Sequence, residues 1–259
     1  MTRVVLVVAL VAGVAAGCSR SPATPSAAPQ VARSTTTTTA AAPTTSVPAA
    51  PEVRERIVAV AKIPQVAVYD APGGNGGGGA VRPSHVLRNP TWEGYGLSFL
   101  VDESRTDGWL KVNVPVRPNG TTGWIQSADV DLAAVRARVE ISLSQHRLRY
   151  WNGSSLLLDE PVALGTSRTP TPTGSFFVDV VAKPPNPRGA YGPYQVSITA
   201  FSDILERFAG GIGQLAIHGT NRPDLIGQNV SNGCIRVSNA AITVLAEHVS
   251  IGTPVDIVA

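Results

Sequence analysis

The sequence predicts a mainly β protein. Short runs in which apolar and polar residues alternate recur along most of the chain, and Gly, Pro or Asn residues separate them. Such runs are typical of strands with one buried face, and the frequent turn residues keep them short. Only two segments have features of a helix. Many short strands with few helices are expected to form small barrels or sandwiches.

The first folded region is predicted over residues 52–135. Its expected strands are 56–60, 65–69, 97–101, 109–114 and 123–125. The glycine-rich stretch 73–79 lacks the lysine and the strand-to-helix setting of a phosphate-binding loop, so we expect a plain connecting loop. Trp92, Trp109 and Trp124 are expected to pack in the core, and a groove for peptide or glycan is the alternative role.

The second folded region is predicted over residues 136–259. Runs 139–143 and 147–151 alternate like the strands of a hairpin, and further strands are expected at 176–182, 195–199 and 215–217. Asn152-Gly153 marks a tight turn after the hairpin. Two helices are expected, a short one after Ser202 and one over 240–249. Ser238 or Asn239 can cap the second helix, and Gly252 follows it.

The N-terminal residues 1–18 have the features of a secretory signal. Arg3 precedes the apolar run 4–14, and small residues follow it up to Cys18. Small residues directly before a cysteine resemble a bacterial lipobox, which would leave Cys18 lipidated. The apolar run is shorter than the roughly 20 residues that span a bilayer. A lipid anchor is therefore predicted, with cleaved secretion or an uncleaved anchor as alternatives.

Residues 19–51 consist almost wholly of Ser, Thr, Ala and Pro. Such a segment cannot bury enough apolar area to offset its chain entropy, so we expect a disordered tether between the anchor and the folded regions. The formal net charge is +3, and no basic run is interleaved with aromatic residues. Nucleic acid is therefore not an expected partner. No cluster of Cys, His and acidic residues has the spacing of a zinc site, so neither a metal nor another cofactor is predicted.

Cys234 is the candidate nucleophile. The chain has two cysteines, and lipidation of Cys18 would leave Cys234 without a disulfide partner in an exported protein. A nucleophilic cysteine needs a nearby base to remove its proton, and His218 is the candidate. The alternatives are an inert buried thiol and a structural histidine.

The residues next to this pair suggest how it is supported. Gly233 permits a close approach of backbone to substrate, and the amides of Gly233 and Cys234 are candidates for an oxyanion hole. The carbonyl of Gly219 is a candidate to fix the tautomer of His218, because no acidic residue lies beside it. The candidate substrate-binding residues are Arg236, Ser231 and Asn232. Arg236 can alternatively pair with an acid, and Ser231 can brace the loop.

The motifs around these residues resemble those of a known family. They are Ser142 to Leu148, Thr169 to Gly174 (TPTPTG), Ile217 to Asn221 (IHGTN), Ile226-Gly227 and Ser231 to Arg236 (SNGCIR). On these residues, the second region resembles the YkuD-type L,D-transpeptidase catalytic domain. Many members have a histidine where this sequence has Asn232. Asp107 to Val112 and Gly123-Trp124-Ile125 resemble bacterial SH3-like domains of cell-wall enzymes. The resemblances imply a small SH3-like β-barrel at 52–135, followed at 136–259 by a β-rich catalytic domain with a few helices.

The resemblance implies a peptidoglycan L,D-transpeptidase that forms 3→3 cross-links through a thioester on Cys234. Its partners would be a tetrapeptide donor stem and the diamino acid of an acceptor stem, with His218 as general acid and base. Water in place of the acceptor amine would make a carboxypeptidase, and a silent catalytic domain would leave a wall-binding lipoprotein. Carbapenem-type β-lactams would acylate Cys234. The expected location is outside the cytoplasmic membrane, lipid-anchored and facing the cell wall.

Overall fold

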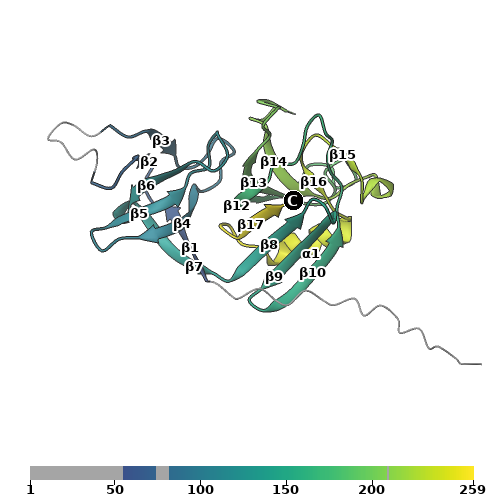
Figure 1. Ribbon diagram of the computed structural model, residues 1–259, viewed down its shortest axis with the longest axis horizontal. Helices are drawn as coiled ribbons and strands as arrows, with labels where there is room; N and C mark the ends of the chain where they lie inside the picture. The colour runs from purple at the N-terminus through teal and green to yellow at the C-terminus, as the bar shows by residue number, and fades with distance from the viewer. Residues whose placement is uncertain (1–54, 74–81, 209) are drawn as a thin grey trace, which may run out of the picture. The chain divides into compact units, whose positions relative to one another are not determined.

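The computed structural model describes residues 55–73, 82–208 and 210–259, and strands dominate it (Figure 1). The mainly β fold class is therefore confirmed. The predicted signal with Cys18, the tether 19–51 and most of the glycine-rich stretch lie outside the described residues. Within the described ranges, no helix is long and apolar enough to cross a membrane.

Seven strands arise from the first region. Five of them form one antiparallel sheet in the order β6-β5-β4-β1-β7. Their bounds are β1 Arg56–Ala61, β4 Ser98–Ser104, β5 Trp109–Asn113, β6 Thr122–Gln126 and β7 Val130–Val135, with a 3-10 turn, η1, at Ser127–Asp129. β2 (Gln65–Val68) pairs with β3 (His85–Arg88) in a separate hairpin. Side chains of both sheets bury one apolar cluster, which includes Val66, Phe99 and Ile125.

The second region forms an eight-stranded sheet in the order β10-β9-β8-β17-β12-β13-β14-β16. Their bounds are β8 Ala137–Ser142, β9 Arg147–Asn152, β10 Ser155–Pro161, β12 Gly174–Ala182, β13 Gln195–Phe201, β14 Gln214–His218, β16 Ile235–Arg236 and β17 Pro254–Val258. Two neighbouring pairs are parallel, β17 with β8 and β14 with β16. A short parallel pair, β11 (Leu164–Gly165) with β15 (Asn229–Ser231), and a 3-10 turn, η2 at Pro223–Leu225, complete the region.

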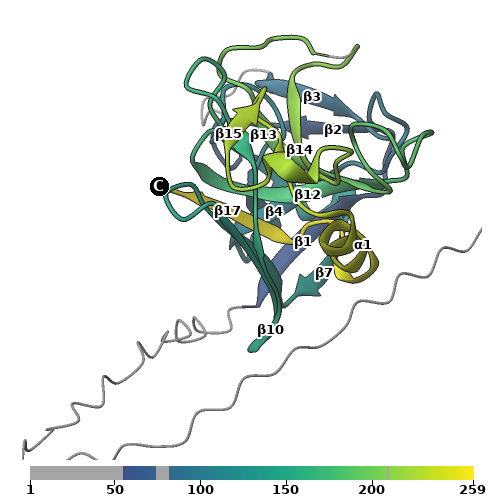
Figure 2. The same cartoon turned by 90° about the vertical axis from the view of Figure 1, so that its right-hand side faces the viewer.

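The predicted helix at 240–249 is confirmed as α1, Asn239–His248. Ser238 caps it, because its hydroxyl accepts from the amide of Ala241 at 3.1 Å. The helix buries Ala241, Ile242 and Leu245 and contacts β10, β13 and β14 (Figure 2). Its first turn thereby lies next to the end of β14, where the candidate site begins.

The short helix predicted after Ser202 is wrong. Ser202 does behave like a helix cap, since its hydroxyl accepts from the amides of Ile204 and Leu205 at 3.3 and 3.0 Å. The carbonyls of Ser202 and Leu205, however, accept from the guanidinium of Arg117. A side chain from another region thus satisfies the carbonyls that a helix would pair with amides of its next turn.

Candidate active site

Adjacent parallel strands bring His218 and Cys234 together. β14 ends at His218, and β16 begins directly after Cys234, with Ile217 opposite Ile235 in the register. Both side chains line one small cavity of about 100 Å³. The sheet therefore brings together two residues whose proximity could not be predicted from their spacing in the sequence.

His218 is buried and held by one strong hydrogen bond. Its Nδ1 lies 2.6 Å from the carbonyl oxygen of Gly219. A carbonyl oxygen can only accept, so Nδ1 carries the proton and Nε2 is the basic nitrogen of the neutral ring. Burial lowers the pKa of His218 to about 4, and the charge of Arg236 acts in the same direction. The imidazole is therefore neutral at pH 7 and able to accept a proton.

Cys234 is half-buried and is not in a disulfide. Burial raises the pKa of its thiol, against smaller opposing effects of a hydrogen bond from the Ala216 backbone and the charge of Arg236. Together with the lowered pKa of His218, this makes the resting pair a neutral thiol beside a neutral imidazole. The thiol must therefore lose its proton during the attack on substrate, and not before it.

The loop that presents Cys234 is braced from within and from the TPTPTG segment. Ser231 Oγ donates to the carbonyl of Cys234 at 2.6 Å and accepts from the amide of Gly233 at 3.1 Å. Thr171 Oγ1 donates to the carbonyl of Gly233 at 2.8 Å, and Thr169 Oγ1 donates to that of Ser231 at 3.2 Å. Gly233 has a φ of 115°, which a side chain would strain.

This bracing corrects one predicted role. The oxyanion hole was expected to use the amides of Gly233 and Cys234, but the Gly233 amide already donates to Ser231 Oγ. The Cys234 amide remains the predicted donor. The hydroxyl of Ser231 donates its hydrogen bond to a carbonyl within the loop, and the residue is only 1% exposed. The bracing role therefore fits Ser231 better than substrate binding does.

Arg236 and Asn232 line the same cavity as the Cys–His pair. Nε of Arg236 is enclosed and has no hydrogen-bond partner among the described residues. Within those residues, no acidic group lies at ion-pair distance from it. An unpaired guanidinium beside a reactive thiol favours binding of a substrate carboxylate over pairing with an acid. The roles of Arg236 and Asn232 in substrate binding remain predictions.

Two residues of the site carry no signal in the sequence. The ring of Tyr191 packs against that of His218 with centroids 4.8 Å apart and planes tilted by 56°. Asn239, the first residue of α1, accepts through Oδ1 from the amide of Thr220 at 2.8 Å. A Cβ on Gly219 would lie 2.3 Å from that oxygen, which explains why glycine follows His218. Tyr191 lies in a Pro/Gly-rich loop without a recognisable motif, and Asn239 lies in a helix, so only the fold reveals their positions.

Residues 136–257 match the family model of the L,D-transpeptidase catalytic domain, YkuD. The matched stretch includes both His218 and Cys234. Two curated relatives are the putative L,D-transpeptidases YkuD of Bacillus licheniformis, 37% identical over 46% of this chain, and of Bacillus subtilis, 33% identical over 46% of this chain. In both cases the alignment spans 64% of the relative's length. A solved structure, L,D-transpeptidase 3 from Mycobacterium tuberculosis, is 18% identical over 53% of this chain and 74% of its own, with a TM-score of 0.39.

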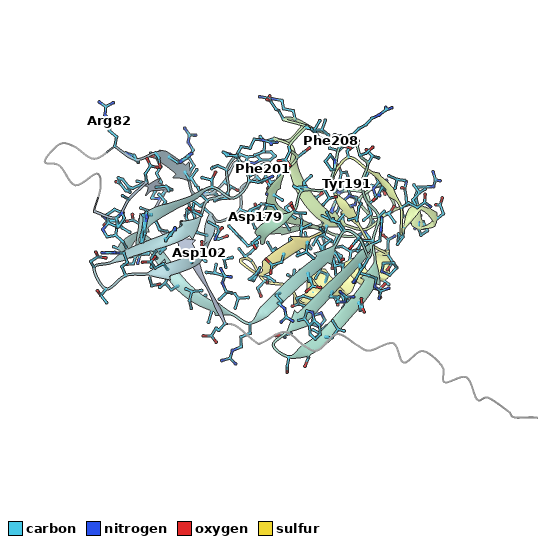
Figure 3. The ribbon with its side chains drawn as sticks, in the orientation of Figure 1. Arg82, Asp102, Asp179, Tyr191, Phe201 and Phe208 are labelled. Carbon is cyan, nitrogen blue, oxygen red and sulfur yellow. The ribbon has the colours of Figure 1, made fainter. Side chains whose placement is uncertain are left out.

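Cys234 of the YkuD-like region is reached from a second, larger cavity of about 490 Å³. Tyr191, Phe208 and Cys234 line both this cavity and the small one that contains His218. Two of these residues, Tyr191 and Phe208, are labelled in Figure 3. The thiol of Cys234 therefore lies at the junction of the two cavities. Such an arrangement suits a two-step acyl transfer, in which one group leaves and another enters.

One wall of these cavities depends on the first region of the chain. The connection between β13 and β14 carries Phe208 and Ile212, and Arg117 donates to three of its carbonyls, those of Ser202, Leu205 and Ile212. The guanidinium also lies over the ring of Phe201, 5.0 Å from its centroid. The side chain of Asn119 binds both the amide and the carbonyl of Phe201, at 2.9 and 2.8 Å. The wall of the YkuD-like site is thus fixed from outside that region.

Proposed function

We propose that the protein is a peptidoglycan L,D-transpeptidase. The observation that carries the proposal is the half-buried thiol of Cys234 in one cavity with a neutral His218, whose basic nitrogen is set by Gly219. The match of residues 136–257 to the L,D-transpeptidase catalytic domain supports the same reaction.

In the first half-reaction, Cys234 attacks the carbonyl of the diamino acid in a tetrapeptide stem. Its proton passes to Nε2 of His218 and then to the departing amine, so that the amide bond breaks and D-alanine leaves. In the second half-reaction, an amine of another stem attacks the thioester and gives its proton to His218. The new amide forms, and the proton returns to the sulfur of Cys234.

Water could replace the acceptor amine in the second half-reaction and would make the protein a carboxypeptidase. The larger cavity at Cys234, about 490 Å³, has room for a peptide amine to approach the thioester. This space favours cross-linking as the main outcome.

Incubation of the purified protein with a disaccharide-tetrapeptide, followed by mass spectrometry, tests this function. We expect free D-alanine and a cross-linked dimer that has lost one D-alanine. A disaccharide-tripeptide alone would identify a carboxypeptidase. Unchanged substrate under conditions in which the protein is folded would contradict both activities and favour a wall-binding role.

We also propose that residues 52–135 are an SH3-like module that helps to hold the protein at the wall. Two antiparallel sheets around one apolar cluster support this proposal. Of the three tryptophans in this module, Trp92 is 61% exposed, so the expectation that it packs in the core is wrong. It lines the cavity that reaches Cys234, which supports a ligand-binding role for this side chain.

The protein is further proposed to be a lipoprotein outside the cytoplasmic membrane. The lipobox-like residues before Cys18 support this location, and two or more acyl chains would hold firmly at about 0.8 kcal/mol per buried CH₂. Cys18→Ser should abolish labelling by a fatty-acid probe and move the protein from the membrane fraction to the soluble fraction. If the variant stays as membrane-bound as wild type, and neither protein is labelled, the anchor is not a lipid.

A further inference from the structure

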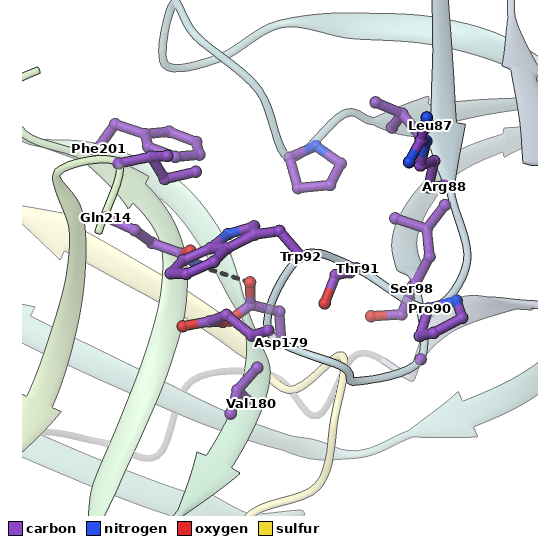
Figure 4. A pocket seen from close by; sticks show the side chains of 15 residues that line it. Leu87, Arg88, Pro90, Thr91, Trp92, Ser98, Asp179, Val180, Phe201 and Gln214 are labelled. Carbon is purple, nitrogen blue, oxygen red and sulfur yellow. Dashed lines mark hydrogen bonds between the residues drawn. The ribbon is translucent and has the colours of Figure 1, made fainter. Parts of the chain in front are cut away.

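A separate cavity of about 370 Å³ adjoins the one that reaches Cys234 (Figure 4). Its walls come from β3 and the connection to β4 on one side, and from β12, β13 and β14 on the other. Apolar side chains such as Leu87, Val180 and Phe201 contribute most of the lining. None of the roles assigned above uses this cavity.

Three residues that line the cavity each have a side-chain oxygen with no hydrogen-bond partner among the described residues. These oxygens are Oδ1 of Asp179, Oγ1 of Thr91 and Oγ of Ser98, and all three are enclosed. The other carboxylate oxygen of Asp179 accepts from Nε2 of Gln214 at 2.6 Å. A buried polar group without a partner is costly, and most such groups in proteins are satisfied. Three such oxygens on residues of one cavity favour a ligand that donates hydrogen bonds.

The charges around the cavity favour a cation. Asp179 and Glu93 both line it, from β12 and from the β3–β4 connection. Burial raises the pKa of Asp179 to about 6, and the negative charge of Glu93 adds to this rise. Arg88 also lines the cavity, but within the described residues it makes no ion pair with either carboxylate, and in Figure 4 it lies beside Leu87, away from Asp179. Among the described residues, neither acid is therefore paired with a basic side chain.

We propose that this cavity binds a primary ammonium group carried on an aliphatic chain. An ammonium has three donors and no acceptor, which matches the three unpartnered oxygens of Asp179, Thr91 and Ser98. The indole of Trp92 also lines the cavity and, at 61% exposed, is free to turn its face toward a bound cation. The apolar lining receives the methylene groups of the chain.

The site connects with the candidate active site. Trp92, Glu93, Ile212 and Gln214 line both this cavity and the one that reaches Cys234. A molecule with its ammonium at Asp179 can therefore extend toward the thiol. The side chain of a diamino acid in a stem peptide has this chemistry. That choice of ligand rests on the proposed function, whereas binding of an ammonium group does not.

Calorimetry on the full protein tests the site without any turnover. Wild type should bind Nα-acetyl-lysine methylamide but not its norleucine counterpart, which has the same shape without the ammonium. Asp179→Asn keeps an acceptor for Gln214 and should weaken binding about tenfold or more, the usual range for loss of a charged hydrogen bond. The matched control is Glu206→Gln, which removes the same charge from an exposed residue outside the cavity. A thermal melt of each variant checks its fold.

Binding should also depend on pH with a definite sign. Below the pKa of about 6, Asp179 is protonated and neutral, so affinity should fall between about pH 7.5 and about pH 5. Burial also raises the pKa of Glu93, so its protonation on acidification acts in the same direction. In the Asp179→Asn variant, affinity should depend less steeply on pH, because the contribution of Asp179 titration is absent.

Two sources of ammonium are distinguished with a stem tripeptide, the same peptide acetylated on its side-chain amine, and the free diamine cadaverine. Tighter binding of the unmodified peptide than of the other two supports the stem peptide. Equal binding of cadaverine and the peptide supports a site for free diamines and overturns the choice of ligand only. Equal affinity of wild type and Asp179→Asn, or of the lysine and norleucine probes, overturns the ammonium site itself, whatever reaction Cys234 performs.

Discussion

Replacement of Cys234 by alanine is expected to abolish both release of D-alanine and formation of the cross-linked dimer. The alanine side chain cannot form a thioester, and no other cysteine lies among the described residues. The fold should survive, because the thiol is half-buried and alanine differs from cysteine only by the loss of the sulfur atom. Product analysis by mass spectrometry measures the loss, and circular dichroism checks the fold.

Two further results bear on this prediction. A carbapenem should add once to the wild-type protein, at Cys234, and should not add to the alanine variant. Peptide mapping locates the adduct. Near-normal turnover of stem tetrapeptides by the variant, or an adduct on another residue, would show that the thiol is not the nucleophile.

Replacement of His218 by alanine is expected to lower turnover by roughly 10²–10⁴-fold, the usual contribution of a positioned acid–base group. The physical reason is the raised pKa of the Cys234 thiol, which keeps it protonated at neutral pH until a base accepts its proton. Alkylation of the thiol near pH 7 should also slow in the variant. The rate of thiol alkylation and the steady-state turnover rate measure the two effects.

The sign of the pH dependence follows from the lowered pKa of His218, about 4. Wild-type kcat/KM should fall as pH drops through that value, because the protonated ring can no longer accept a proton, and the alanine variant should lack this inflection. His248→Ala is the matched control: its ring also has Nδ1 near a backbone carbonyl, that of Val244 at 2.8 Å, but it is exposed at the end of α1. Identical alkylation profiles of wild type and His218→Ala from about pH 5 to about pH 9 would remove His218 from this role.

The strands with a buried, alternating face could be predicted from the sequence, and several others could not. β1, β5 and β9 follow their predicted ranges closely because one face of each enters an apolar cluster. β7 was not predicted, since its residues 131–134 are exposed and show no alternation. β16 is only two residues long, too short for any pattern. Its place in the sheet follows from the partner strand β14.

The same difference applies to the candidate site. Cys234 and His218 could be selected because their residue types and neighbours carry chemistry in the sequence itself. Tyr191, Asn239 and Arg117 could not, because each acts on the site through a contact between segments distant in sequence. The protonation states of the pair also depend on burial, which the residues alone do not determine.

The contact between Arg117 and the β13–β14 connection limits how this gene can exchange parts with others. Recombination often joins catalytic and accessory modules as independent units, each with its own core. Here a fusion that replaced the first region would leave the carbonyls of Ser202, Leu205 and Ile212 without their shared donor, beside the cavity of Cys234. The catalytic sheet is therefore expected to keep this wall of its site only when it is joined to the loop that carries Arg117 and Asn119.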